Sequence, residues 1–194
     1  PAANSQGDVE VLIAATRKEK VDDRMALADA AGLKLTVMDV ESYAGRMALS
    51  RLIQQLPNQG ENTTVALFEI GSQATSMQVL RDDKVLYDRE QPFGSAQLLK
   101  LIVRQYGLTM EEAVIKRRNA DLPDDYATAV LDPFVTNVSN EIGRALQFFF
   151  TSTQHSSVDY IMLSGEAGIF GGLSKAVTAQ TTFPCAVINP FEAM

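Results

Sequence analysis

The chain has 194 residues, of which 46% are hydrophobic, and it carries a formal net charge of −7 and a single cysteine. This length and apolar content suffice for a globular core, and no apolar run approaches the roughly 20 residues that a membrane-spanning helix needs. The negative charge disfavours nonspecific binding to nucleic acid or anionic lipid, and one cysteine excludes an internal disulfide. We therefore expect a soluble protein with no nucleic-acid partner and no direct membrane insertion.

The first part of the chain alternates strand-like and helix-like patterns. Residues 9–15 predict a strand, and an apolar stripe that begins at Val21 predicts a helix closed by Gly32. Residues 35–40 predict a second strand, and the next helix, which carries Met47, Leu49, Ile53 and Leu56, runs to Pro57.

A polar run, Pro-Asn-Gln-Gly-Glu-Asn-Thr at 57–63, is the clearest linker of the chain. We place a lobe boundary there. Residues 1–57 are then the remnant of a first lobe, and residues 58–194 form a second lobe with a helical insertion at about 107–157.

The second lobe is predicted to begin with three strands that end at Glu90, followed by three helices. Ser95 is expected to cap the first helix, and Thr109 with Glu112 forms a capping-box pattern for the next. Pro133 marks the start of the longest helix or a kink in it. One face of that helix is apolar and comprises Val130, Phe134, Val138, Ile142, Leu146 and Phe149.

Residues 65–80, VALFEIGSQATSMQVL, predict a strand, a glycine turn and a second strand. Glu69 places a carboxylate at the tip of the first strand, where it could hold a hydrated magnesium ion. The turn residues that could surround a phosphate through backbone N–H groups and hydroxyls are Gly71, Ser72, Gln73 and Thr75. Strand-to-glycine turns are common in α/β proteins, so this motif alone identifies no ligand.

A second motif, YIMLSGEAGIFGGL at 160–173, predicts a buried strand that runs into a glycine-rich helix start. A ligand could approach the backbone closely where the strand ends. The candidate binding residues there are Ser164, Gly165, Glu166 and Ala167.

The order of these parts resembles the second lobe of the actin, Hsp70 and sugar-kinase ATPase superfamily. Four longer phrases, at 9–44, 86–98, 106–113 and 189–194, are similar to the PilM family, actin-like cytoplasmic proteins of type IV pilus assembly. The resemblance covers nearly the whole chain. It implies an α/β protein with the actin-like (ribonuclease H-like) ATPase fold, of which this chain supplies one near-complete lobe and part of the other.

The resemblance also implies ATP and magnesium as ligands of the intact protein. Glu69 stands where the family usually has an aspartate, and Glu166 stands where a glycine is common. Glu112 and Lys116 resemble a pair that flanks the adenosine, with an ordinary surface pair at i,i+4 as the alternative. Glu41 lies where relatives position the attacking water, with stabilisation of a helix N-terminus as the alternative.

We therefore expect a cytoplasmic scaffold of the pilus machine, which binds ATP between its lobes and docks the tail of PilN, an inner-membrane partner, alongside other pilus components. By comparison with the family, the chain is expected to be a fragment that lacks the first phosphate hairpin and the terminal helix. Two alternatives stay open: a catalytic ATPase or kinase of the same fold, and a fragment that self-associates as a homodimer.

Overall fold

A computed structural model of the protein describes residues 13–82, 84–166, 170–189 and 191. The chain divides into two compact units, residues 1–48 and 49–194. The boundary between them falls inside helix α2 (Glu41–Ile53). The larger unit contains the sheet and both glycine motifs, and so carries most of the candidate site.

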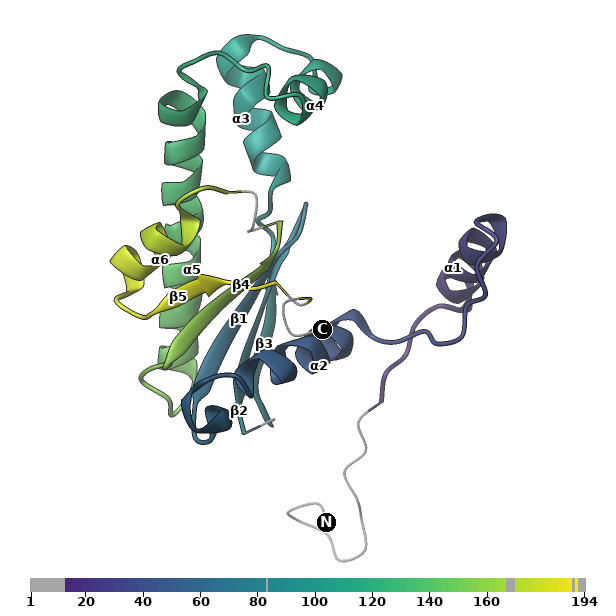
Figure 1. Ribbon diagram of the computed structural model, residues 1–194, viewed down its shortest axis with the longest axis vertical. Coiled ribbons are helices and arrows are strands. Elements are labelled where there is room, and N and C mark those ends of the chain that lie inside the picture. The colour runs from purple at the N-terminus through teal and green to yellow at the C-terminus, as the bar shows by residue number, and fades with distance from the viewer. Residues whose placement is uncertain (1–12, 83, 167–169, 190, 192–194) are drawn as a thin grey trace, which may run out of the picture. The chain divides into compact units, whose positions relative to one another are not determined.

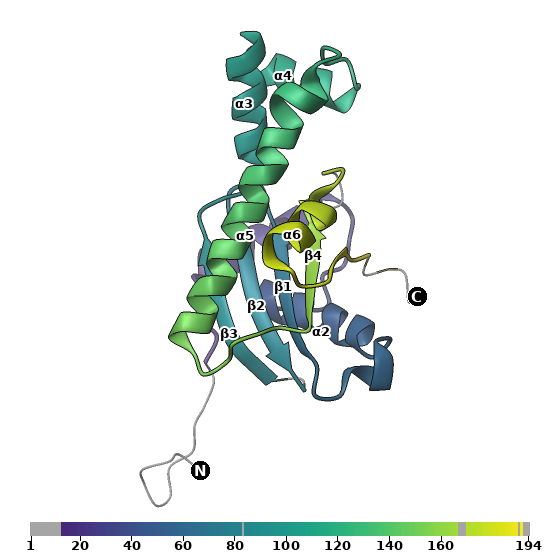
Figure 2. The same cartoon turned by 90° about the vertical axis from the view of Figure 1, so that its left-hand side faces the viewer.

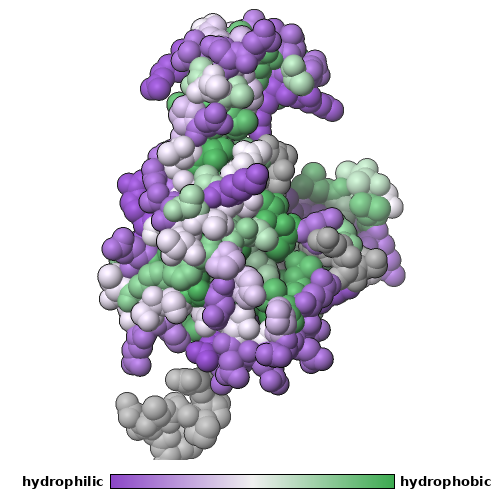
Figure 3. All heavy atoms as spheres, turned by 60° about the vertical axis from the view of Figure 1, so that its left-hand side comes forward, coloured by the Kyte–Doolittle hydropathy of each residue, from purple (hydrophilic) through white to green (hydrophobic). Residues whose placement is uncertain are grey.

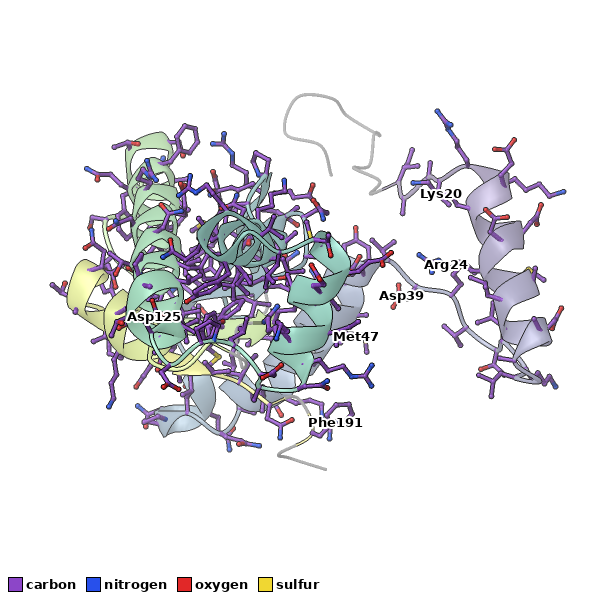
Figure 4. All side chains as sticks on the ribbon, turned by 90° about the horizontal axis from the view of Figure 1, so that it is seen from above. Lys20, Arg24, Asp39, Met47, Asp125 and Phe191 are labelled. Atoms are coloured by element: carbon purple, nitrogen blue, oxygen red, sulfur yellow. The ribbon has the colours of Figure 1, made fainter. Side chains whose placement is uncertain are left out.

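The described part of the first unit forms helix α1 (Lys18–Ala30) and the first residues of α2. No residue of α1 is buried. Lys20 and Arg24, one helical turn apart, leave the same side of this helix (Figure 4).

The prediction of a strand at 35–40 is wrong, because residues 33–40 have no strand structure. Of the strand predicted at 9–15, residues 13–15 are also irregular, and residues 9–12 lie outside the described part of the chain. An alternating pattern makes a strand possible, but its N–H and C=O groups need a neighbouring strand. The described strands pair only with one another, all of them within the second unit.

A five-stranded mixed sheet, in the order β3-β2-β1-β4-β5, forms the centre of the second unit (Figure 1). The three strands predicted up to Glu90 are confirmed and pair antiparallel, whereas β4 and β5 are parallel to β1. The strands are β1 (Thr64–Ile70), β2 (Thr75–Arg81), β3 (Lys84–Gln91), β4 (Tyr160–Gly165) and β5 (Cys185–Val187).

Helices cover both faces of this sheet. Helices α5 (Asp132–Ser152) and α6 (Leu173–Thr181) lie across one face (Figure 2). The apolar stripe predicted for α5 is confirmed, since Phe134, Ile142 and Phe149 are buried in the main core. On the other face, Leu49 of α2 packs in a smaller cluster with residues of β1, β2 and β4, whereas Met47 is 65% exposed and belongs to neither core.

Helix α3 (Ala96–Tyr106) precedes the insertion predicted at about 107–157, and α4 (Met110–Arg118) is the first helix within it. The two helices lie close together in Figure 1. The predicted capping box of α4 is confirmed, because the Thr109 hydroxyl accepts from the Glu112 N–H and the Glu112 carboxylate accepts from the Thr109 N–H. A turn of π-helix, η2 (Ala127–Leu131), then leads into α5. Pro133 lies in the first turn of α5 and marks its start.

Candidate nucleotide site

The two glycine motifs meet because β1 and β4 are neighbouring parallel strands. Glu69 is paired with Ser164, and Ile70 is paired with Gly165. Both motifs leave the sheet at the carboxyl ends of these strands, where ligands commonly bind in α/β proteins. The sheet therefore brings the hairpin tip and the glycine-rich segment to one place.

Gly165 makes the close approach of the two strand ends possible. Its backbone has a φ of +69°, and a Cβ at this position would lie 2.5 Å from the carbonyl oxygen of Ile70. A side chain would therefore be strained by its own backbone and would push the strand ends apart. Only glycine fits this position without a shift of the backbone.

The hairpin turn is fixed to the N-terminus of α3 through backbone groups. The N–H groups of Ser95 and Ala96 donate to the carbonyl oxygens of Gly71 and Ser72, at 3.0 and 2.9 Å. Ser95 is the N-cap residue, as predicted, but its side chain makes no capping bond. The first N–H groups of this helix are thus satisfied by the hairpin.

Gly94 is a site residue that the sequence interpretation missed. A Cβ on it would lie 2.5 Å from the carbonyl oxygens of both Gly71 and Ser72, so it lets the turn lie against the chain before α3. The available signal was the glycine itself, in the segment Gln-Pro-Phe-Gly-Ser between a strand and a helix.

The polar side chains of the hairpin divide into structural and exposed groups. Thr75 is 1% exposed, and its hydroxyl donates to the carbonyl oxygen of Phe93 at 2.8 Å. This hydroxyl therefore holds the hairpin in place. Ser72 and Gln73 are exposed on the turn and can reach a ligand.

Glu69 is half-buried at the tip of β1. Within the described residues, no group of three or more His, Cys, Asp or Glu side chains could hold a metal ion. Magnesium commonly keeps several waters and binds proteins through one or two carboxylates together with substrate phosphates. A single carboxylate beside exposed turn residues fits that mode of binding.

The predicted adenosine pair has other partners in this structure. The Glu112 carboxylate accepts from the N–H and the hydroxyl of Thr109, at 2.8 and 2.9 Å. These bonds, above all the one from the backbone N–H, lower the pKa of Glu112. Lys116 forms an ion pair with Asp121, with 2.8 Å between Nζ and Oδ2. Both side chains are thus fixed by neighbours in the chain, and their role at adenosine stays a prediction.

Two of the three remaining candidates lie at the ends of elements. Glu166 directly follows β4 and is half-buried, and Ala167 lies outside the described residues. Glu41 is the first residue of α2 and is exposed in the first unit. Its role in positioning water and its interaction with the helix dipole both stay predictions.

The model of the family described as type IV pilus assembly protein PilM matches residues 1–194. A chain in the solved structure "PilM-PilN type IV pilus biogenesis complex" is 26% identical, with a TM-score of 0.71, over 92% of this chain and 50% of that one. The chain thus spans about half the length of that relative.

Two more distant structures bear on the fold alone. The ethanolamine utilization protein EutJ from Carboxydothermus hydrogenoformans is 18% identical, with a TM-score of 0.65, over 92% of this chain and 59% of its own. The archaeal actin homolog Ta0583 is 13% identical, with a TM-score of 0.57, over 84% of this chain and 52% of its own. The predicted actin-like α/β fold is confirmed. Together with the match over the whole chain, this shows that the chain belongs to the PilM family of type IV pilus assembly proteins.

Proposed function

We propose that the protein is an actin-like scaffold of type IV pilus assembly, which binds ATP with magnesium in its intact form. We further propose that it docks the cytoplasmic tail of a PilN-like inner-membrane protein and contacts other components of the pilus machine. Family membership and the similarity to a chain solved in a PilM–PilN complex support the partner. The pairing of Glu69 with Ser164 carries the nucleotide part, because it joins the two motifs.

In the proposed nucleotide site, each residue has a defined task. Ser72 and Gln73, exposed on the hairpin turn, bind phosphate oxygens. Glu69 holds the magnesium ion through the water molecules bound to the ion. The ion then neutralises part of the phosphate charge. Gly165 lets the ends of β1 and β4 approach each other, and Glu166, the next residue, lies beside the nucleoside.

The partner is proposed to respond to the nucleotide. A protein of two lobes that closes around ATP shifts its population towards the closed form, and a partner that prefers that form then binds more tightly. No helix in the described part of the chain is long and apolar enough to cross a membrane. We propose a cytoplasmic protein that is held at the inner membrane by its partner.

Fluorescence anisotropy with a labelled peptide tests this function. The peptide carries the cytoplasmic tail of the PilN homologue from the same organism, and it is titrated with the full-length protein, with and without ATP and magnesium. The proposal requires saturable binding whose Kd changes with the nucleotide. If the Kd of the peptide were the same with and without the nucleotide, the protein would be a scaffold that the nucleotide does not regulate. Absence of peptide binding would refute the proposed partner. ATP turnover abolished by Glu41→Gln would instead favour the catalytic ATPase.

A second candidate function, self-association, is favoured by apolar side chains in the first unit. They are exposed to water and comprise Leu33 (65%), Leu35 (41%), Val37 (75%), Met38 (44%) and Val40 (40%). Large exposed apolar surfaces commonly mark interfaces. Sedimentation at rising concentration tests this candidate, and a monomer throughout would refute it.

A further inference from the structure

A cavity of about 480 Å³ is lined by residues of α3, α4 and the segment that includes η2. It is lined by Leu99, Val114, Arg117, Arg118, Tyr126 and Leu131. None of the residues predicted to contact the nucleotide lines it, and all six belong to the second unit. This volume lies within the range of protein pockets that bind ligands, at about 300–1,000 Å³.

The apolar part of the lining comes from three elements. Leu99 belongs to α3, Val114 to α4 and Leu131 to η2. Val114 is 45% exposed, on a helix that buries only Ala113. Figure 3 shows the α3–α4 region, at the top, as mainly hydrophilic with scattered apolar residues. An apolar side chain that entered the cavity would remove such surface from water, which is favourable.

The charged part of the lining is entirely basic. Among the described residues, Arg117 and Arg118 are the only charged ones in the lining, in a chain whose formal net charge is −7. Burial raises the pKa of the Tyr126 hydroxyl and the nearby Arg117 opposes that rise, whereas Arg118 has no ion pair among the described residues. The cavity therefore offers two guanidinium groups with no acidic residue in its lining.

Acidic residues lie near in the sequence but have partners of their own. Asp121 pairs with Lys116, and Asp125, labelled in Figure 4, accepts a hydrogen bond of 3.0 Å from the hydroxyl of Tyr106. Neither lines the cavity. The lining itself therefore holds two positive charges and no negative one.

A π-helical turn, which is rare in proteins, forms one side of the cavity. The π-helical turn η2 begins directly after Tyr126 and ends at Leu131, so it supplies or adjoins two of the six lining residues. Single π-turns are infrequent in proteins and often occur at functional sites. This feature agrees with a binding role.

We propose that this cavity docks a segment of a partner protein in which a carboxylate adjoins a large apolar side chain. The guanidinium groups of Arg117 and Arg118 bind the carboxylate, since their planar donors match its two oxygens. The apolar side chain enters between Leu99, Val114 and Leu131. None of the residues that line this surface is among those predicted to contact the nucleotide.

Nuclear magnetic resonance titration of the ¹⁵N-labelled chain tests the proposal. The probe is the capped peptide acetyl-Gly-Glu-Leu-Glu-Phe-Gly-amide, and a matched peptide carries glutamine in place of both glutamates. The acidic peptide should shift the amide signals of Val114, Arg117, Tyr126 and Leu131. The Kd should be about tenfold higher when the glutamine peptide replaces the acidic one. It should rise by about the same factor when the acidic peptide binds Arg118→Gln, as expected for the loss of a charge-assisted hydrogen bond.

Lys175→Gln, on α6, is the matched control, because it removes the same charge from an exposed residue outside the cavity. It should bind the acidic peptide like the unmodified chain. The proposal would be overturned if the two peptides bound with equal affinity, or if no amide signals shifted at the cavity. It would also be overturned if Lys175→Gln and Arg118→Gln weakened peptide binding equally. Arg118 is exposed, so its variant is expected to keep the fold, which its own spectrum verifies.

Discussion

Glu69 on β1 lies directly opposite Ser164 on the parallel strand β4. One backbone pairing thus connects a hairpin and a glycine-rich segment that are far apart in the sequence. Any change that separates β1 from β4 should disturb both halves of the proposed nucleotide site together. The predictions below begin with this contact.

Gly165→Ala should destabilise the protein by about 2 kcal/mol, because the new Cβ meets the Ile70 carbonyl and φ is positive. Urea unfolding measures this change. Gly171→Ala is the matched control, since a Cβ there meets nothing within 4 Å and its φ is not in the left-handed region. The interpretation of the strand contact is wrong if both variants unfold at the same urea concentration.

Glu112→Gln should lower stability near neutral pH and have no effect in acid. The hydrogen bonds from Thr109 lower the folded-state pKa of Glu112, so its charge stabilises the fold above the unfolded pKa of about 4.3. This contribution disappears as the pH falls through the folded-state value. Unfolding at pH 7 and pH 3 measures the difference.

Glu111→Gln is the control for Glu112→Gln, because it removes the same charge from the same helical turn but not from the capping box. It should have a smaller effect at pH 7, confined to the helix dipole. An equal effect of the two variants would show that the capping bonds contribute nothing measurable.

Phe149→Ala should cost about 3–5 kcal/mol, since this side chain is fully buried and its ring packs 5.4 Å from that of Tyr87. The neighbouring Phe148 is 49% exposed, with the guanidinium of Arg89 4.2 Å from its ring centre. Phe148→Ala should therefore cost about 1 kcal/mol or less. Calorimetric melting compares the two, and a reversed order would refute the assigned faces of α5.

Cys185 should react slowly with a disulfide reagent at pH 8. Burial raises the pKa of its thiol to about 12, so almost no thiolate, the reactive form, is present in the folded protein. The unfolded chain, with an ordinary thiol pKa, serves as the control and should react at once. Equal rates in the two states would contradict a buried thiol.

Local signals in the sequence predict much of the second unit. The acidic hairpin, the capping box at Thr109 and the apolar stripe that ends at Phe149 all appear where the patterns place them. Each pattern is complete within a few residues, so no distant partner is needed to interpret it. The π-turn η2 was missed because Ala-Thr-Ala-Val-Leu is also an ordinary helical sequence.

Features that depend on distant partners could not be predicted in this way. The alternating segment 35–40 has the composition of a strand, yet no described strand pairs with it. Thr75 was predicted to face a phosphate, but the loop after β3 supplies the carbonyl of Phe93 that binds its hydroxyl. Strand pairing and such loop contacts are decided by packing across the fold.

Calorimetric titration with ATP and magnesium tests the central claim most directly. We would compare the full-length protein with its Glu69→Ala and Asp88→Ala variants, since Asp88 on β3 gives a control that removes the same charge outside the site. The account predicts magnesium-dependent binding that Glu69→Ala weakens about tenfold or more and Asp88→Ala leaves unchanged. Absence of binding, or equal binding by all three proteins, would contradict it.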